Sequence, residues 1–339
     1  MTIKLKRYKP HVLLSYEALL RRLKKRYRFN EIIQSNYQRH KAGFQGEKRI
    51  DYKLSLFPKK NFYHYPHLRL NTNQNHFQID SLLITPKIIF ILEIKNLKGI
   101  LEYSSKYGQI IQIDDGKETG YMDPILQVEI QKQHLINWLG KIGYQIPIEP
   151  LVVSTNPYAV IRNIDNDKVF DHRFISLENL LFKLDEIYNS YQNPILTIKE
   201  IQFLLKKFIK HNNPLKSNLM KRHKIQSHHL VSGIPCDICE RTLLRLHGKW
   251  YCKHCNTKFL NSHVRVILDY FLLHNSTITN NQCKTLLQLS SPNIAYKILS
   301  SMNLENNGKN KGRKYFSPEI WEFPQNAEPA LPNTSILDK

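Results

Sequence analysis

The stretch Phe90-Ile-Leu-Glu93-Ile-Lys95-Asn-Leu-Lys-Gly99 begins with apolar residues, which are followed by an acid and a base two positions apart, Glu93 and Lys95. Side chains alternate between the two faces of a β-strand, so Glu93 and Lys95 should lie on the same face. Thirteen residues before Glu93, Asp80 lies in a second apolar run, Phe77–Ile84, which Thr85-Pro86 separates from the stretch that leads into Phe90. So short a connection predicts a hairpin that brings Asp80 close to Glu93.

Two carboxylates and one ammonium on one face of a sheet would suit a divalent metal. A bound metal polarises a phosphate and lowers the pKa of an attacking water, which is the chemistry of phosphodiester hydrolysis. A Glu-x-Lys pair alone is weak evidence, because most such pairs are solvated charges on an exposed face. The hypothesis therefore depends on further residues elsewhere in the chain.

Two predicted helices supply such residues. Glu47 follows Gly43-Phe-Gln-Gly46, after which we expect a helix with Ile50 on its inward face. Glu47 would share that face, where a carboxylate is costly unless a metal or a cation meets it. Asp123-Pro124-Ile-Leu-Gln127 has a typical cap followed by proline at the first helical position, and it predicts a second helix.

These motifs resemble the nuclease-related domain (NERD), a branch of the PD-(D/E)xK restriction-endonuclease-like superfamily. The resemblance covers roughly residues 41–160 and rests on the order and spacing of Gly-x-x-Gly-Glu, Gln-Ile-Asp, Glu-Ile-Lys-Asn-x-Lys-Gly and Pro-x-x-Gln. It implies an α/β fold with a restriction-endonuclease-like mixed sheet flanked by helices. One departure is Ile79, which stands where the superfamily motif has proline, a residue often missing in this branch.

The resemblance also implies roles for individual residues. Asp80 and Glu93 would ligate Mg²⁺ or Mn²⁺, and Glu47 would contribute to the metal site from the first helix. Lys95 would orient the attacking water and help to deprotonate it. Gln127 would correspond to the glutamine of the following helix in the family.

The composition indicates a polyanionic partner. Among 339 residues, 50 Lys and Arg face 28 Asp and Glu, a formal charge of +22. DNA is the partner we expect first, and RNA is equally compatible with basic charge. A lysine-rich proteome is the alternative explanation. The charge is uneven, however, with six basic residues in Arg21–Arg28 and a second bias in Lys199–Lys224, which favours a surface that binds a nucleic-acid backbone.

No apolar run approaches the roughly 18–20 residues needed to span a bilayer, and the first residues lack a secretory apolar core. We therefore expect a cytoplasmic protein with no membrane partner. We divide the chain into a basic helical arm (1–41), the NERD-like domain with a helical extension (42–211), a basic linker (212–234), a zinc ribbon (235–260), a winged-helix-like module (261–318) and a loose tail (319–339).

Four of the five cysteines form two Cys-x-x-Cys knuckles, Cys236/Cys239 and Cys252/Cys255, separated by twelve residues. This spacing resembles a zinc ribbon with one structural Zn²⁺ and a hairpin turn near Gly248. The alternatives are disulfides, which are rare in cytosolic proteins, and a redox pair, which does not require two knuckles. Four thiolates leave no open position for catalysis. We expect the fifth cysteine, Cys283, to be a core residue.

The C-terminal region predicts three short helices followed by a basic β-wing, which resembles a winged helix-turn-helix. Such modules also bind proteins, so a protein-interaction module is the alternative. The candidate nucleic-acid contacts are Asn293, Tyr296 and Lys297 on the third helix, with Lys309, Lys311 and Arg313 on the wing.

The sequence therefore predicts a metal-dependent hydrolase that cleaves phosphodiester bonds of DNA. A non-catalytic nucleic-acid-binding or regulatory protein that retains a nuclease fold is the alternative, and an RNA-directed enzyme is the third interpretation.

Overall fold

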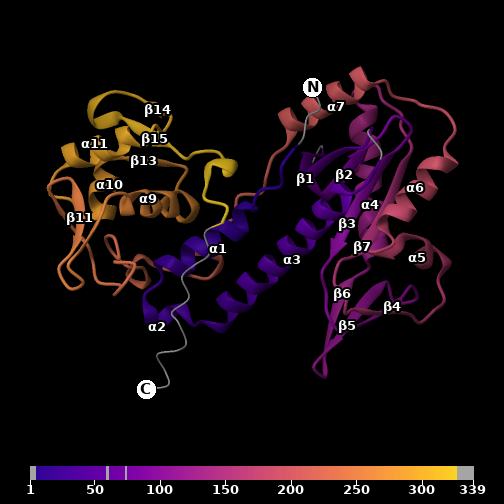
Figure 1. Ribbon diagram of the computed structural model, residues 1–339, viewed down its shortest axis with the longest axis horizontal. Helices are drawn as coiled ribbons and strands as arrows, with labels where there is room; N and C mark the ends of the chain where they lie inside the picture. Colours follow the sequence, from indigo (N-terminus) through magenta and orange to yellow (C-terminus); the bar gives the residue numbers. More distant parts are fainter. Residues whose placement is uncertain (1–4, 59–60, 73–74, 327–339) are drawn as a thin grey trace. The chain divides into compact units, whose positions relative to one another are not determined.

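The computed structural model describes residues 5–58, 61–72 and 75–326. The chain divides into two compact units (Figure 1). Unit 1 comprises Met1–Arg7 and Lys41–Leu215, and unit 2 comprises Tyr8–His40 and Lys216–Lys339. The division between Tyr8–His40 and unit 1 falls inside one long helix, α3 (Glu31–Ser55).

A mixed five-stranded sheet forms the centre of unit 1, which confirms the predicted α/β class. The strands lie in the order β1-β2-β3-β7-β9; the β1–β2 and β2–β3 pairs are antiparallel and the β3–β7 and β7–β9 pairs are parallel. The predicted hairpin is the β2–β3 pair. The strand bounds are β1 Tyr63–Asn71, β2 His76–Ile84, β3 Ile89–Lys95, β7 Ile148–Ser154 and β9 Phe174–Ser176.

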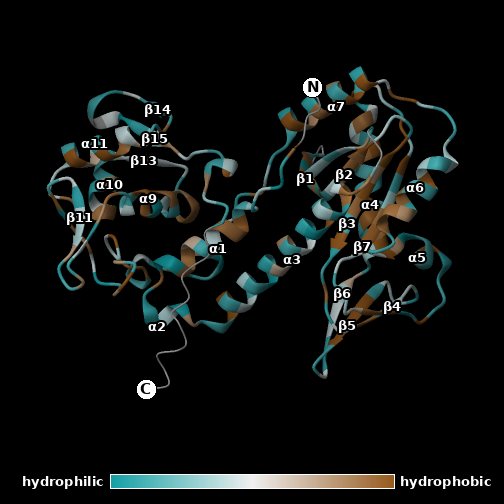
Figure 2. Ribbon diagram, in the orientation of Figure 1, coloured by the Kyte–Doolittle hydropathy of each residue, from teal (hydrophilic) through white to brown (hydrophobic). Residues whose placement is uncertain are grey.

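Helices cover both faces of this sheet. Ile50 of α3 and the apolar face of α6 (Leu180–Ser190) pack on one face, against Phe90, Leu92 and Leu151. Helices α4 (Pro124–Gly140) and α7 (Ile198–His211) pack on the other face, against residues such as Ile89 and Ile91. Because both faces are buried, β3 and β7 are apolar almost throughout instead of alternating (Figure 2).

The pairing of β1 with β2 is interrupted at one point. Pro66 pairs with Ser81 and Leu68 pairs with Ile79, but His67 and Asp80 between them are unpaired. His67 has a left-handed backbone, with φ of 53°. The alternation of side chains that face the core on the α4 side also shifts by one residue at this point. On β1 the core residues are Tyr63 and Tyr65 before it and Leu68 and Leu70 after it. On β2 they are Phe77 and Ile79 before it and Leu82 and Ile84 after it. Irregularities of this kind re-aim side chains and are frequent beside active sites.

A second, four-stranded sheet has the order β6-β5-β4-β8 and shares the core on the α4 side through Leu101, Tyr103 and Ile110. Gly99 immediately precedes β4, the first strand of this sheet along the chain, and its φ is 77°. A Cβ on Gly99 would lie 2.3 Å from the Ile113 carbonyl oxygen. Only glycine fits this position. The bounds are β4 Ile100–Ser104, β5 Gln109–Asp114, β6 Lys117–Met122 and β8 Val160–Asn163, with α5 at Lys168–Arg173 before β9.

In unit 2, α1 (His11–Arg22), α2 (Lys25–Arg28) and the first part of α3 accompany the C-terminal half of the chain. The five leucines predicted as the apolar positions of the arm are buried, and the Ser15 hydroxyl donates to the Leu272 carbonyl of α9 (Ser262–Leu273), with an O···O distance of 3.2 Å. The leucines are Leu13, Leu14, Leu19, Leu20 and Leu23.

The expectation that the whole of Arg21–Arg28 binds a nucleic-acid backbone is wrong for three of its four arginines, Arg21, Arg22 and Arg28. Arg21 pairs with buried Asp269 at 2.7 Å, and Arg28 pairs with Glu240 at 2.7 Å. Buried Arg22 donates to the carbonyls of Val231 and Gly233. These arginines hold the fold together, whereas Lys24, Lys25 and Arg26 are exposed.

The interval predicted as a linker contains a short helix, α8 (Leu219–Arg222), and a 3₁₀ turn, Ser227–His229. Leu219 is buried, and the Lys24 amide donates to the His229 carbonyl at 2.9 Å. The part of this interval from Lys216 onward therefore belongs to the packed structure of unit 2.

The remainder of unit 2 contains a three-stranded sheet, β10-β11-β12, then the helices α9, α10 and α11, and a second three-stranded sheet, β13-β15-β14, whose first strand lies between α9 and α10. The Trp250 indole of β11 donates to buried His263 of α9 at 3.0 Å and thereby joins the first sheet to the helices. Cys283 is fully buried, as expected. The bounds are β10 Leu244–Leu246, β11 Lys249–Cys252, β12 Thr257–Phe259, β13 Thr277–Thr279, α10 Asn280–Leu287, α11 Pro292–Ser301, β14 Asn306–Asn307 and β15 Lys314–Phe316.

The predicted tail begins with a 3₁₀ turn, Ile320–Glu322, and buried Phe323, and residues 327–339 lie outside the described part of the chain. Within the described ranges, no helix has the length and apolar character needed to cross a membrane.

Candidate functional site

Glu93 is the centre of a hydrogen-bonded cluster at the end of β3. Its side chain is buried, with 4% of the residue exposed. Lys95 Nζ lies 2.8 Å from Glu93 Oε1, which confirms that the two residues share one face of the strand. The Gln127 amide donates to the same oxygen at 2.7 Å and accepts from Lys95 at 2.9 Å. The Gln131 amide donates to Glu93 Oε2 at 2.8 Å.

Both glutamines belong to helix α4. Because they are four residues apart, they lie on the same face of the helix, and both reach Glu93. Its start is fixed as predicted: Asp123 Oδ1 accepts from the backbone amides of Ile125 and Leu126, and Pro124 is the first helical residue. Gln131 was not predicted from the sequence. Its spacing of four residues from Gln127 is the signal that would have identified it.

Asp80 precedes Ser81 on β2, and Ser81 pairs with Leu92, the residue before Glu93 on β3. Asp80 and Glu93 therefore lie beside each other on neighbouring strands. Its Oδ2 accepts from the backbone amide of Ile94 at 3.1 Å. Burial raises the pKa of Asp80 well above its ordinary value, and the charges of Glu93 and Glu47 add to this effect. Three acids this close favour a bound cation, because each ionised carboxylate destabilises the others.

Glu47 lies on α3, and its side chain is 14% exposed. The expectation that this helix begins after Gly46 is wrong, because α3 runs from Glu31 through both glycines to Ser55. Helix packing, and not local propensity, explains Gly46. A Cβ on Gly46 would lie 2.6 Å from Thr155 Oγ1 and 2.7 Å from Asn96 Cβ, so glycine lets α3 approach the ends of β3 and β7 closely.

The second unpredicted residue is Arg7. Its side chain is 2% exposed and contacts Glu47, Asp51, the Asp80 carbonyl and the Ser81 hydroxyl. The sequence offered no signal for it, since it is one of many basic residues near the N-terminus. Nearby, burial lowers the pKa of His64 to about 4, so this imidazole is neutral at pH 7 and Arg7 is the cation that faces Asp51.

The donor set of this site fits Mg²⁺ or Mn²⁺. Carboxylate oxygens are the ligands that these hard cations prefer, and Mg²⁺ is commonly held by one or two carboxylates together with waters and substrate phosphates. In the structure, the ligand oxygens of Glu47, Asp80 and Glu93 do not form a set within 4.8 Å of one another. Asp80 and Glu93, which are adjacent across the hairpin, are therefore the pair that would hold the metal.

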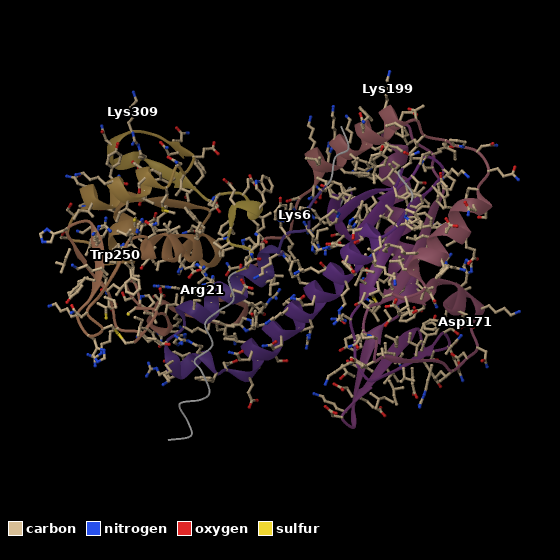
Figure 3. The ribbon with its side chains drawn as sticks, in the orientation of Figure 1. Lys6, Arg21, Asp171, Lys199, Trp250 and Lys309 are labelled. Carbon is tan, nitrogen blue, oxygen red and sulfur yellow. The ribbon has the colours of Figure 1, made fainter. Side chains whose placement is uncertain are left out.

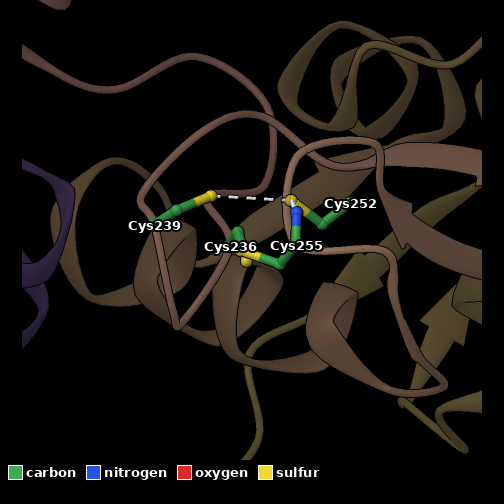
Figure 4. A group of neighbouring side chains, drawn as sticks. All are labelled: Cys236, Cys239, Cys252 and Cys255. Carbon is green, nitrogen blue, oxygen red and sulfur yellow. Dashed lines mark hydrogen bonds between the residues drawn. The ribbon is translucent and has the colours of Figure 1, made fainter.

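Four thiols form the second candidate metal site (Figure 4). The sulfur atoms of Cys236, Cys239, Cys252 and Cys255 lie within 4.8 Å of one another, the only such group in the described ranges. Backbone amides of Ile238 and Cys255 donate to the sulfurs of Cys236 and Cys252, which favours thiolate ligands. The set could bind a structural metal, and its chemistry fits zinc. The hairpin turn is at His247-Gly248, as predicted.

Most of the predicted nucleic-acid contacts are at the surface of unit 2. Asn293, Tyr296 and Lys297 are exposed on α11, and Lys309 is exposed in the loop before β15 (Figure 3). The Arg313 guanidinium lies 5.3 Å from the centre of the Tyr296 ring, so the helix and the wing are in contact. The side chain of Lys311 lies outside the described part of the structure.

Comparison with known families supports the resemblance of the central region. The family model described as "Nuclease-related domain" (NERD) matches residues 42–155. This match, which suggests a nuclease-related function, covers Glu47, Asp80, Glu93, Lys95 and Gln127. Neither the curated proteins nor the solved structures gave a match to the chain.

The packing at Gly46 leads to a test with a matched control in the same helix. Gly46→Ala should destabilise unit 1 by about 1–3 kcal/mol, because the methyl group overlaps Thr155 and Asn96. Gly43→Ala should instead stabilise the helix by about 0.5–1 kcal/mol, because a Cβ there meets nothing within 4 Å. Urea denaturation would measure both changes. Equal effects of the two substitutions would contradict this account.

The four thiols predict one tightly bound zinc per chain. Cys252→Ser should lower the zinc content and unfold the β10–β12 region, since metal binding supplies much of the folding free energy of such small modules. Elemental analysis and limited proteolysis would measure the two effects. Cys283→Ser is the matched control, because this buried thiol lies outside the cluster and its replacement should leave the zinc content unchanged.

Proposed function

We propose that the protein is a metal-dependent nuclease that hydrolyses phosphodiester bonds of DNA. The observation that carries the proposal is the buried Glu93 carboxylate, which contacts Lys95 and two glutamines beside Asp80. A buried acid whose partners are polar and which adjoins a second acid is characteristic of catalytic sites. The NERD match over the same residues supports this assignment.

The residues of the site have distinct roles in this proposal. Asp80 and Glu93 would hold Mg²⁺, which when bound would polarise the scissile phosphate and acidify a water. Lys95 is held between Glu93 and Gln127, so its ammonium occupies a defined position from which it can orient the attacking water. Gln127 keeps both groups in place by donating to the one and accepting from the other. Glu47 would contribute from α3.

Unit 2 would hold the substrate. The order α9–β13–α10–α11–β14–β15 agrees with the predicted winged helix-turn-helix, and this agreement supports a role for α11 as the helix that enters a groove of DNA. The exposed side chains of Asn293 and Lys297 lie on that helix, with Lys309 on the wing. RNA has the same phosphate charge, so the choice between DNA and RNA is part of the test.

One observation favours the alternative of a non-catalytic nucleic-acid-binding protein. Both Glu93 oxygens accept hydrogen bonds from side chains, and the three acids do not converge within 4.8 Å. In that case the cluster would be a structural element that stabilises the end of β3, and metal would have no effect on it.

Removal of the proposed catalytic groups separates the two functions. Asp80→Ala and Lys95→Ala should each reduce cleavage by about 10²-fold or more, with DNA affinity nearly unchanged. Lys98→Ala is the control, because this exposed lysine lies three residues further along and pairs with Asp114. The measurement is cleavage of single-stranded DNA, double-stranded DNA and RNA in Mg²⁺ or EDTA. Normal cleavage by Asp80→Ala, or no cleavage by the unaltered protein, would refute the proposal.

The substrate-holding role of unit 2 leads to a separate test. The double variant Lys297→Ala/Lys309→Ala should weaken binding to duplex DNA. It should also reduce the slope of log affinity against log salt by about 0.9 for each phosphate that the protein no longer neutralises. Lys258→Ala, which removes an exposed lysine from β12, should change neither quantity. Unchanged affinity of the double variant would assign α11 and the wing to a protein partner.

A further inference from the structure

Arg7 lies outside the NERD match, yet it is embedded in the candidate site of unit 1. Leu5, two residues earlier, packs against the core on the α4 side of the sheet and anchors this short segment. The Arg7 guanidinium meets α3 and β2 together. It forms a two-pronged contact with Asp51 at 2.8–3.0 Å, one hydrogen bond to Glu47 at 2.9 Å, one to the Asp80 carbonyl at 3.2 Å and one to the Ser81 hydroxyl at 2.7 Å.

A purely structural anchor would need fewer of these contacts. The two-pronged pair with Asp51 would suffice to hold the N-terminal segment on α3. Two of the remaining hydrogen bonds go to one proposed metal-site residue, Glu47, and to the backbone of another, Asp80. Arg7 therefore fixes the distance between the helix and the strand that carry these two acids.

The contact with Glu47 also selects one of its oxygens. Arg7 Nη1 and His67 Nε2 lie 2.9 Å and 2.7 Å from the same atom, Glu47 Oε2. In the described ranges, the contacts of the Glu47 carboxylate with Arg7 and His67 both go to Oε2. The negative charge of Glu47 raises the pKa of Asp80, so the carboxylate lies within electrostatic reach of the metal-binding pair.

The charge balance distinguishes positioning from simple electrostatic attraction. Glu47, Asp51, Asp80 and Glu93 are four acids, and Arg7 and Lys95 are the cations bonded to them within unit 1. When these six groups are ionised and the neighbouring histidines are counted as neutral, two negative charges remain, which one divalent cation would neutralise. Without Arg7 a third negative charge would remain, and Asp51 would be a half-buried acid with no cationic partner at pH 7 among the described residues. By charge alone this would strengthen the attraction for Mg²⁺, so a loss of Mg²⁺ affinity on removal of Arg7 would report lost positioning of the acids and not lost charge.

We propose that Arg7 is a positioning residue for the metal site: it holds Glu47 by one oxygen and ties α3 to β2, so that the site is set to receive Mg²⁺. This proposal rests on the proposed nuclease function. It also means that the catalytic unit requires a segment 35 residues before the region matched by the family model. A fragment that begins at residue 42 would lack this arginine.

The test measures Mg²⁺ binding directly, so that it does not depend on cleavage alone. Calorimetric titration of the 339-residue chain with Mg²⁺, without DNA, gives the dissociation constant, and cleavage assays give the Mg²⁺ concentration for half-maximal rate. Arg7→Ala should raise both about 10- to 100-fold, the range typical of groups that orient metal ligands. Lys6→Ala removes the same charge from the adjacent, exposed position and should leave both unchanged (Figure 3).

A double-mutant cycle separates positioning from general stabilisation. If Arg7 acts through Glu47, the effect of Arg7→Ala on Mg²⁺ affinity should largely disappear in a Glu47→Gln background. An equal reduction in both backgrounds, or wild-type Mg²⁺ affinity of Arg7→Ala, would overturn the proposal. If Arg7→Ala does not fold, Arg7→Lys keeps the charge and removes the two-pronged geometry; it should give an intermediate shift, and wild-type affinity of this variant would overturn the proposal as well.

Failure of the underlying function can be distinguished from failure of this inference. If the unaltered protein neither binds Mg²⁺ nor cleaves any substrate, the nuclease proposal fails and the role of Arg7 falls with it. If the unaltered protein does both and Arg7→Ala is indistinguishable from it, the nuclease proposal stands and only the role of Arg7 is refuted.

Discussion

A carboxylate buried at the end of a central strand is the constraint on which unit 1 depends. Burial of an ionised Glu93 without partners would cost several kcal/mol or more. The neighbouring elements supply the partners: Lys95 from the same strand, and Gln127 and Gln131 from α4. The position of α4 is in turn fixed by the Asp123 cap and by the apolar residues that α4 buries against the sheet. The polar cluster and the hydrophobic core are thus held in place by the same helix.

The second constraint is the irregularity that delivers Asp80. In a regular β1–β2 pair, every second side chain would face the same side throughout. Here this alternation shifts by one residue in both strands, at His67 and Asp80. The left-handed backbone at His67 costs of order 1 kcal/mol or more, and the same residue places its imidazole next to Glu47. Strain, unpaired strand residues and clustered acids therefore coincide at one point, which is the pattern expected where a structure is shaped by chemistry and not by packing alone.

Much of this arrangement could be predicted from the sequence, because it depends on local patterns. The period of two brings Glu93 and Lys95 together, the short turn brings Asp80 to β3, and the Asp-Pro pair begins α4. The cysteine spacing likewise predicts the cluster of four thiols. What the sequence could not provide depends on contacts between distant segments. Arg7 lies 40 residues before Glu47, and nothing distinguishes it from other basic residues near the N-terminus. The glycines of α3 suggest a helix start when only local propensity is considered, although the close approach to Asn96 and Thr155 explains at least Gly46.

The same limit applies to net charge. Counted along the chain, Arg7, Arg21, Arg22 and Arg28 increase the apparent basic surface, but all four are bonded inside their own units. Arginine is suited to this internal role because its planar guanidinium donates in several directions and stays ionised when buried. Lysine holds its charge on a flexible stem that is easily solvated, and Lys24 and Lys25, which lie between these arginines, are exposed. A polyanion would therefore be bound by the exposed basic residues, such as Lys24, Lys25 and Arg26, and their number describes a binding surface better than the formal charge of the chain does.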